Sequence, residues 1–331
     1  MTQRYIVGDV GGTNDDLAVV ERKENDFEIV FKQDKSTDNQ QSFLEGLKRF
    51  LTDLEGEFED NEFKEACFAV AGPVEDRNVE MPNADLTIDA EAIERETSLD
   101  TVLLINDFDA LGYATELLEE EDYITVQQGE QSPENQPKAV IGAGTGLGKN
   151  FLIYDQGLER YVPHSSEGGH SDLPLKNRKE LELAEFIQDL ENISHQISYE
   201  HVLSGKGLEN MYRFFNRNSF QKEGTQAEQI SKTRETNPCS QKTFSKFIEF
   251  YARCCRNYAL DTLPREGLYI AGGIAAQNPD SIDDLFLEEF RNSSPQFREL
   301  LTKIPIRVIT NYDISLKGAA RAMELESNRS T

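Results

Sequence analysis

Short apolar runs alternate with amphipathic stretches along this chain of 331 residues. A run of apolar residues that is short and continuous is typical of a strand covered on both faces of an α/β sheet. Such runs occupy residues 67–72, 101–105, 139–142 and 268–273. Helical spacing of apolar positions, as in residues 42–54, predicts amphipathic helices between them. The other helices are expected at residues 89–96, 108–118, 180–190, 199–215, 243–262 and 315–324, and further strands at 27–35, 64–74 and 306–309.

Two segments have the same order of strand, glycine-rich turn and returning strand. The first is YIVGDVGGTN at residues 5–14, followed by an apolar run to residue 20. The second is residues 139–154, with the turn GAGTGLG at 142–148. Glycine lets backbone N–H groups converge on an anion, because no Cβ blocks the approach. The repetition predicts two related halves, each with a turn suited to phosphate.

The apolar strand TVLLIND ends abruptly in Asn106 and Asp107. Ligands of α/β sheets lie beyond the carboxyl ends of the strands, so both side chains are candidates for a site. Asp107 has two interpretations. It is a general base, or it caps the helix that follows, where Asp is favoured.

Composition restricts the partners. The chain has 61 acidic and 34 basic residues and a net charge of −27. A surface of this sign repels nucleic acid and anionic membranes, so neither is an expected partner. No apolar run reaches the roughly 18 residues that span a bilayer, and the start of the chain is not typical of a signal peptide. The four cysteines form no CxxC pair, which favours reduced thiols in a cytoplasmic protein.

Taken in order, the motifs resemble those of bacterial-type glucokinases, in the hexokinase and actin-like ATPase superfamily. They are GDVGGTN, AVAGPV, LLINDF, GAGTGLG, EGGH, YEHVLSGKGL and YIAGGI, and they extend over nearly the whole chain. The resemblance implies a two-domain actin-like ATPase (ribonuclease H-like) α/β fold, with a cleft between a smaller and a larger domain. We expect the small domain at residues 1–107 plus about 308–331 and the large domain at 108–307. The resemblance also implies a homodimer, ATP-dependent phosphorylation of glucose to glucose 6-phosphate, and Mg²⁺.

The resemblance assigns the site residues. Asp107 is the expected base, and Asp9 is expected to hold Mg²⁺ through water. Carboxylates and imidazole can share hydrogen bonds with the hydroxyl groups of an uncharged sugar. The expected sugar-binding residues are Asn83, Asn106, Asp107, Glu167, His170 and Glu200. The expected nucleotide-binding residues are Asp9, Gly11, Gly12, Thr13, Asn14, Gly144, Thr145, Gly146, Gly272 and Gly273.

The chain departs from the family pattern at several places. Asp15 and Asp16 follow GGTN, where the family has a small residue and then Arg. A carboxylate in place of a cation near a phosphate loop weakens charge stabilisation. Lys149 and Asn150 replace small apolar residues after the second turn. Ser166 replaces the usual Gly before Glu167.

Two rival functions remain open at this point. One is a related kinase acting on another hexose or an N-acylhexosamine. The other is a catalytically weakened sugar-binding homologue, which the two acidic residues after GGTN favour. Consumption of ATP with glucose, measured beside glucose binding alone, discriminates between the classes.

Overall fold

The computed structural model describes residues 3–11, 14–24, 26–36, 43–58, 63–81, 86–217 and 226–328. The chain divides into two compact units. The first comprises Met1–Glu119 and Tyr312–Thr331, and the second comprises Glu120–Asn311. The boundaries between these units fall at 119/120 and 311/312, whereas the sequence placed the domain boundaries at 107/108 and about 307/308.

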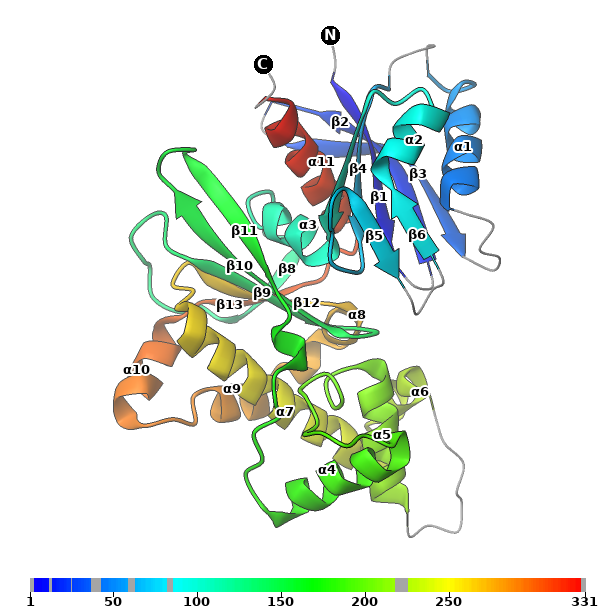
Figure 1. Cartoon of the computed structure of the whole chain (residues 1–331). Helices are drawn as coiled ribbons and strands as arrows, with labels where there is room; N and C mark the ends of the chain where they lie inside the picture. The colour runs from blue at the N-terminus through cyan, green and yellow to red at the C-terminus, as the bar shows by residue number, and fades with distance from the viewer. Residues whose placement is uncertain are drawn as a thin grey trace. The chain divides into compact units, whose positions relative to one another are not determined.

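The first unit is built on a five-stranded sheet in the order β3-β2-β1-β4-β7. Strands β1, β4 and β7 are parallel neighbours, and β1, β2 and β3 form an antiparallel meander (Figure 1). A small hairpin pairs β5 with β6. The strands are β1 (Arg4–Val10), β2 (Asn14–Arg22), β3 (Phe27–Ser36), β4 (Glu65–Val70), β5 (Asn78–Met81), β6 (Leu86–Asp89) and β7 (Thr101–Asn106). The helices are α1 (Phe43–Leu54), α2 (Ala90–Glu96), α3 (Asp107–Ala114) and α11 (Ile314–Ser327).

Alternation along the strands gives this sheet two apolar faces. Tyr5 and Val7 of β1 pack in one buried cluster with Leu316 and Met323 of α11. The intervening Ile6 joins the opposite cluster, which includes α1 and α2. Successive side chains of a strand point to opposite faces, so helices must cover both. This explains the continuous apolar runs in the sequence.

The second unit contains a six-stranded sheet in the order β11-β10-β9-β12-β13-β8. Its largest buried cluster includes the long helix α7. The strands are β8 (Tyr123–Gln127), β9 (Lys138–Ala143), β10 (Leu147–Asp155), β11 (Arg160–Ser166), β12 (Gly267–Ala271) and β13 (Ile306–Ile309). The α-helices are α4 (Arg178–Glu191), α5 (Gly205–Asn216), α6 (Ala227–Lys232), α7 (Pro238–Thr262), α8 (Gly273–Gln277), α9 (Asp284–Phe290) and α10 (Pro295–Lys303). Two 3₁₀ turns are η1 (Gly168–His170) and η2 (Pro279–Ser281).

The two sheets share an arrangement of five strands, to which the second sheet adds β8, antiparallel to β13. In each, an antiparallel meander of three strands is continued on the side of its first strand by two parallel strands. The expectation of two related halves is confirmed. The first strand of each meander leads into the glycine-rich turn, so the two turns occupy corresponding positions in their own units.

Several predicted elements were wrong in their limits. The helix expected at 199–215 begins only at Gly205, because the Ser204 hydroxyl accepts a hydrogen bond from Gly207 N at 3.0 Å and caps it. No element was predicted between residues 74 and 89, where β5 lies, or between residues 215 and 243, which contain α6 and the first turn of α7. β8 and β11 also lie outside the predicted strands.

Candidate active site

In the first unit, Asp9, Asn106 and Asp107 lie at one end of the sheet. Register places Asp9 beside Ala69 of β4, and Ala69 beside Ile105 of β7. The strands are parallel, so the carboxyl ends of β1 and β7 meet at the same edge. The sequence-predicted residues from these two strands are therefore brought together.

Asn106 is the N-cap of α3, and Asp107 is the first residue of that helix. The Asn106 Oδ1 accepts from Phe108 N at 2.9 Å, and its Nδ2 donates to the Gly72 carbonyl at 3.1 Å. Asn106 therefore makes the N-cap of α3, which was the alternative role considered for Asp107. The Asp107 carboxylate accepts from Phe108 N at 3.0 Å and keeps its remaining acceptor positions.

Burial raises the pKa of Asp107 to about 7, and the negative charge of Asp9 adds to the shift. Its hydrogen bond from the Phe108 backbone opposes the shift without cancelling it. A carboxylate with a pKa near the working pH is well suited to accept and release a proton. This is the property that a general base requires.

Asp9 is held by the last helix of its unit. Ser315 Oγ donates to Asp9 Oδ2 at 2.6 Å. Burial raises the pKa of Asp9, while the hydrogen bond from Ser315 lowers it. Sequence reasoning missed Ser315, because nothing near residue 315 indicates that α11 packs on β1.

The charges around Asp9 include a cation from β3. Lys32 Nζ lies 3.3 Å from Asp16 Oδ2 and 2.7 Å from Asp313 Oδ1. Asp16 is the cross-strand partner of Asp9. The resemblance implied an arginine on β2 at the position of Asp16. Here that position is acidic, and the nearby cation is Lys32 of the adjacent strand β3. Spacing in the sequence gave no signal of this pair, which depends on the β2–β3 register.

Other predicted residues of this unit are only partly described. Gly11 follows β1 directly and is partly buried. Asn14 begins β2, and its side chain lies outside the described atoms. Gly12, Thr13 and Asn83 lie outside the described residues.

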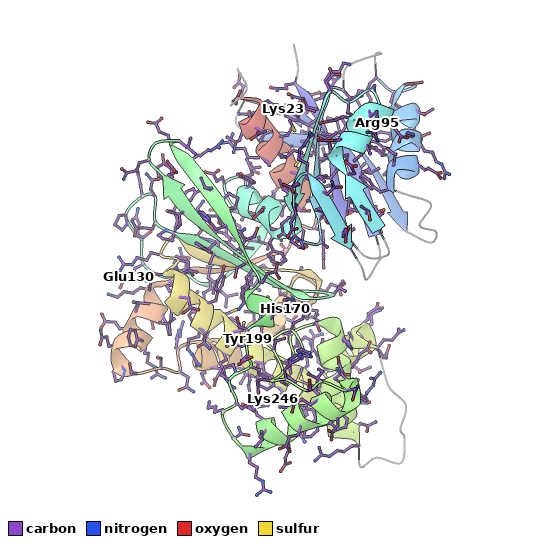
Figure 2. The ribbon with its side chains drawn as sticks, viewed as in Figure 1. Lys23, Arg95, Glu130, His170, Tyr199 and Lys246 are labelled. Carbon is purple, nitrogen blue, oxygen red and sulfur yellow. The ribbon has the colours of Figure 1, made fainter. Side chains whose placement is uncertain are left out.

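In the second unit, Glu167, His170 and Glu200 converge. His170 Nε2 lies 3.8 Å from Glu167 Oε2, and its Nδ1 lies 3.9 Å from Glu200 Oε1. The side chains of Glu167 and His170 are 77% and 61% exposed, and His170 follows the end of β11 (Figure 2). Three polar groups within reach of one another, two of them open to solvent, can share hydrogen bonds with a polyol.

Glu200 links this group to the second glycine turn. Its Oε2 accepts from Leu147 N at 2.9 Å, and its backbone N–H donates to the Gly169 carbonyl at 3.0 Å. A Cβ on Gly146 would lie 2.6 Å from Glu200 Oε2, and one on Gly169 would lie 2.1 Å from the Leu147 carbonyl oxygen. Glycine is therefore required at residue 169, where the obstacle is backbone, whereas a side chain at residue 146 would displace the Glu200 carboxylate.

The two nucleotide turns predicted in this unit follow neighbouring strands. Gly144, Thr145 and Gly146 follow β9, and Gly272 and Gly273 follow β12. The register pairs Ala271 with Gly142 in a parallel ladder, so both turns leave the same edge of the sheet. Gly272 has φ +84°, and a Cβ there would lie 2.6 Å from the Ala143 carbonyl oxygen. Nothing lies within 4 Å of the corresponding position on Gly273.

Comparison with known proteins covers nearly the whole chain. The family model described as Glucokinase matches residues 6–326. A glucokinase of Nostoc sp. (strain PCC 7120) is 33% identical over an alignment of 340 positions, gaps included, which covers 95% of this chain and 97% of the relative.

Solved structures share the fold. A glucokinase from an Antarctic psychrotroph superposes with a TM-score of 0.81 at 25% identity, covering 97% of this chain and 99% of the other. A ROK family glucokinase from Streptomyces griseus, in complex with glucose and AMPPNP, has a TM-score of 0.64 at 19% identity, with 97% and 99% covered. The predicted two-domain α/β fold of the actin-like ATPases is confirmed. By its sequence and its fold, the chain belongs to the glucokinase family.

Proposed function

We propose that this protein transfers the γ-phosphoryl group of ATP to the primary hydroxyl of glucose, with Asp107 as the general base. Family membership supports the activity. The observation that supports the base is the carboxylate at the end of β7 with a pKa of about 7. Glucose and AMPPNP bound by the Streptomyces griseus relative support the substrate and the phosphoryl donor.

The reaction needs alignment, charge neutralisation and a proton acceptor. The glucose hydroxyl oxygen forms a bond to the γ-phosphorus, the bond from that phosphorus to the bridging β–γ oxygen breaks, and ADP leaves. Asp107 takes the hydroxyl proton as the new bond forms. Glu167, His170 and Glu200 would hold the sugar hydroxyl groups, together with Asn106 and Asn83.

The glycine turns would bind the nucleotide through backbone N–H groups. The sequence predicts one such turn at Gly11, Gly12, Thr13 and Asn14, and a second at Gly144, Thr145 and Gly146. Gly272 and Gly273 would let the adenosine approach the backbone, because Gly273 has open space where a side chain would stand.

The residues present fit Mg²⁺ held through water. Within the described residues, no group of three or more His, Cys, Asp or Glu side chains is arranged to hold a metal ion. Mg²⁺ keeps several waters and needs only one or two protein carboxylates beside substrate phosphates. Asp9 is partly buried, and the Ser315 hydroxyl bonds one of its oxygens and orients it. Bound Mg²⁺ would neutralise charge on the phosphates.

A coupled assay that detects glucose 6-phosphate tests the proposal. We expect turnover with glucose and MgATP, and less with mannose, fructose or N-acetylglucosamine at equal concentration. A higher kcat/KM for another sugar would favour the related-kinase alternative. Glucose binding by calorimetry without ATP consumption would favour the sugar-binding homologue.

We also infer a cytoplasmic homodimer. All four cysteines are free, which fits a reducing compartment. None of the helices in the described parts of the chain combines the length and apolar character that crossing a bilayer requires. Light scattering coupled to size-exclusion chromatography measures the oligomeric state, and a mass equal to one chain of 37.5 kDa would contradict the dimer.

A further inference from the structure

Lys149 is a buried lysine directly behind the proposed sugar-binding turn. It lies on β10, opposite Ser166 of β11, and is only 6% exposed. Its Nζ donates to the Gly168 carbonyl oxygen at 2.8 Å. The same ammonium lies 4.9 Å from the ring centroid of Tyr199 and 5.3 Å from that of Tyr258. Tyr199 lies beside the turn, since its backbone N–H donates to the Ser171 carbonyl at 3.0 Å (Figure 2).

In the described parts of the chain, this ammonium has no carboxylate partner. Among the residues that the structure describes, no Asp or Glu oxygen lies within 4.0 Å of Lys149 Nζ. A buried cation is costly unless strong acceptors surround it. Here the acceptors are one backbone carbonyl and the faces of two aromatic rings, with the Cys254 thiol nearby. The Gly168 carbonyl is therefore the main directional partner of the charge.

The carbonyl that Lys149 holds is in the middle of the EGGH segment. Gly168 N donates to Ser166 Oγ at 3.1 Å, so both polar groups of this residue are fixed from the strands. Glu167 precedes Gly168, and His170 follows two residues later. A segment with two adjacent glycines has many accessible conformations, and holding its carbonyl removes most of them. The directions of Glu167 and His170 then follow from the position of this peptide.

We propose that Lys149 is a positioning residue that fixes the sugar-binding turn through the Gly168 carbonyl. The inference rests on the proposed function, because it assumes that Glu167 and His170 bind the sugar. The resemblance to the family implies a small apolar residue at this place. Such a residue cannot donate a hydrogen bond to the turn.

A cavity beside Lys149 makes the proposal testable by chemical rescue. The cavity has a volume of about 430 Å³ and is lined by Lys149, Phe151, Ser166, Gly168, Tyr258 and Asp261, among others. Truncating the lysine to Ala leaves room next to the Gly168 carbonyl that a small alkylammonium ion can enter. The added ion restores the donor without restoring the covalent side chain.

The first experiment measures KM for both substrates in Lys149→Met. Losing a charged hydrogen bond corresponds to about 10-fold or more in an equilibrium constant. We expect the KM for glucose to rise by about that factor, and the KM for ATP to change less than about twofold. Lys138→Met is the matched control. Lys138 is also 6% exposed in the same sheet, but it lies over the Tyr161 ring, away from the turn.

The rescue experiment uses Lys149→Ala with n-propylammonium chloride. We expect the added ion to lower the glucose KM of this variant toward the wild-type value and to leave the wild type unchanged. Tetramethylammonium, which carries the charge but no N–H donor, should not rescue. Equal effects of both ions, or none from propylammonium, would overturn the hydrogen-bond role.

A variant of the turn itself keeps the test decisive if the lysine variants fold poorly. A Cβ on Gly168 would lie 3.0 Å from Ser166 Oγ, 3.1 Å from Lys149 Cδ and 3.3 Å from Lys149 Nζ. Gly168→Ala should therefore displace the ammonium and raise the glucose KM. An unchanged glucose KM in Gly168→Ala or in folded Lys149→Met would refute the inference.

The experiments distinguish a failure of the proposed function from a failure of the positioning role of Lys149. If the wild type does not phosphorylate glucose, that function is wrong, and glucose binding to the wild type and Lys149→Met by calorimetry then tests the positioning role alone. Equal dissociation constants would refute it.

Discussion

At the scale of single residues, environment gives one of two acids in the first turn of α3 a raised pKa. Asp107 and Asp109 are two residues apart at the start of α3. Burial and the nearby Asp9 raise the pKa of Asp107 to about 7, whereas Asp109 acts on it only as a weaker like charge. A raised pKa at a strand end is the feature expected of a catalytic base.

Replacement of Asp107 should therefore affect turnover more than binding. Asp107→Asn keeps an acceptor for Phe108 N but cannot take a proton. We expect kcat to fall by about 10²–10⁴, the usual range for loss of a general base, with glucose binding retained. Initial rates and calorimetry measure the two quantities. A kcat near the wild-type value would show that another group accepts the proton.

The same variant should change how stability depends on pH. The folded pKa of Asp107 is about 7 against an ordinary value of 3.8, so the folded state binds this proton more tightly. Its contribution is complete below pH 3.8 and is lost as pH rises through 7, where the ionised carboxylate destabilises the fold. Asp107→Asn avoids that loss. Urea unfolding should show the variant gaining stability over the wild type between pH 5 and pH 8, on the order of 3 kcal/mol. If the difference in unfolding free energy between the variant and the wild type is the same at pH 5 and pH 8, the pKa of Asp107 is not raised.

At the scale of elements, neighbouring glycines at the end of β12 have different tasks. Gly272 has φ +84° and has backbone atoms of Ala143 where a Cβ would stand. Gly273 has open space there and begins α8. The fold requires glycine at residue 272. At residue 273 it does not, and the open space there can admit a ligand.

The glycine pair yields a matched comparison. Gly272→Ala forces both strain and a clash, so we expect a loss of stability of about 1–3 kcal/mol. Gly273→Ala should not destabilise the protein, because its position is open and α-helical. If the adenosine approaches this backbone, Gly273→Ala raises the KM for ATP and leaves the KM for glucose unchanged. Thermal melts and substrate titrations separate the effects. An unaltered KM for ATP would remove Gly273 from the nucleotide site.

The ion pair between β2 and β3 provides a second comparison. Asp16 lies 3.3 Å from Lys32, which also contacts Asp313. Asp16→Arg places two cations together, and we expect a cost of about 1 kcal/mol at low salt. Adding Lys32→Asp restores an opposite pair and should recover most of that loss. Urea unfolding of the single and double variants measures the coupling. Additive effects would show that the two side chains do not interact in solution.

At the scale of the whole molecule, 61 acidic residues oppose 34 basic ones, for a net charge of −27. Self-repulsion of this size opposes the compact state, and salt screens it over a distance of about 10 Å at 0.1 M. We expect the melting temperature to rise as NaCl increases from about 0.01 to 0.5 M. Differential scanning calorimetry measures this. A melting temperature that falls over the same range would indicate that the ion pairs contribute more than the repulsion.

The sequence by itself determined the positions of the strands and turns that carry the chemistry. Glycine-rich turns after apolar strands and the abrupt strand end at Asn106 and Asp107 are local features, because backbone freedom and side-chain size act within a few residues. The repeated strand–turn–strand order likewise predicted two related halves.

Only the tertiary structure decided which groups meet. The bond from Leu147 N to Glu200, the hydroxyl of Ser315 on Asp9 and the ammonium of Lys149 under Gly168 each join residues distant in sequence or on different strands. Strand register and helix packing create these contacts, and neither is encoded in a short window of sequence. The raised pKa of Asp107 has the same origin, since burial and a charge from another strand produce it.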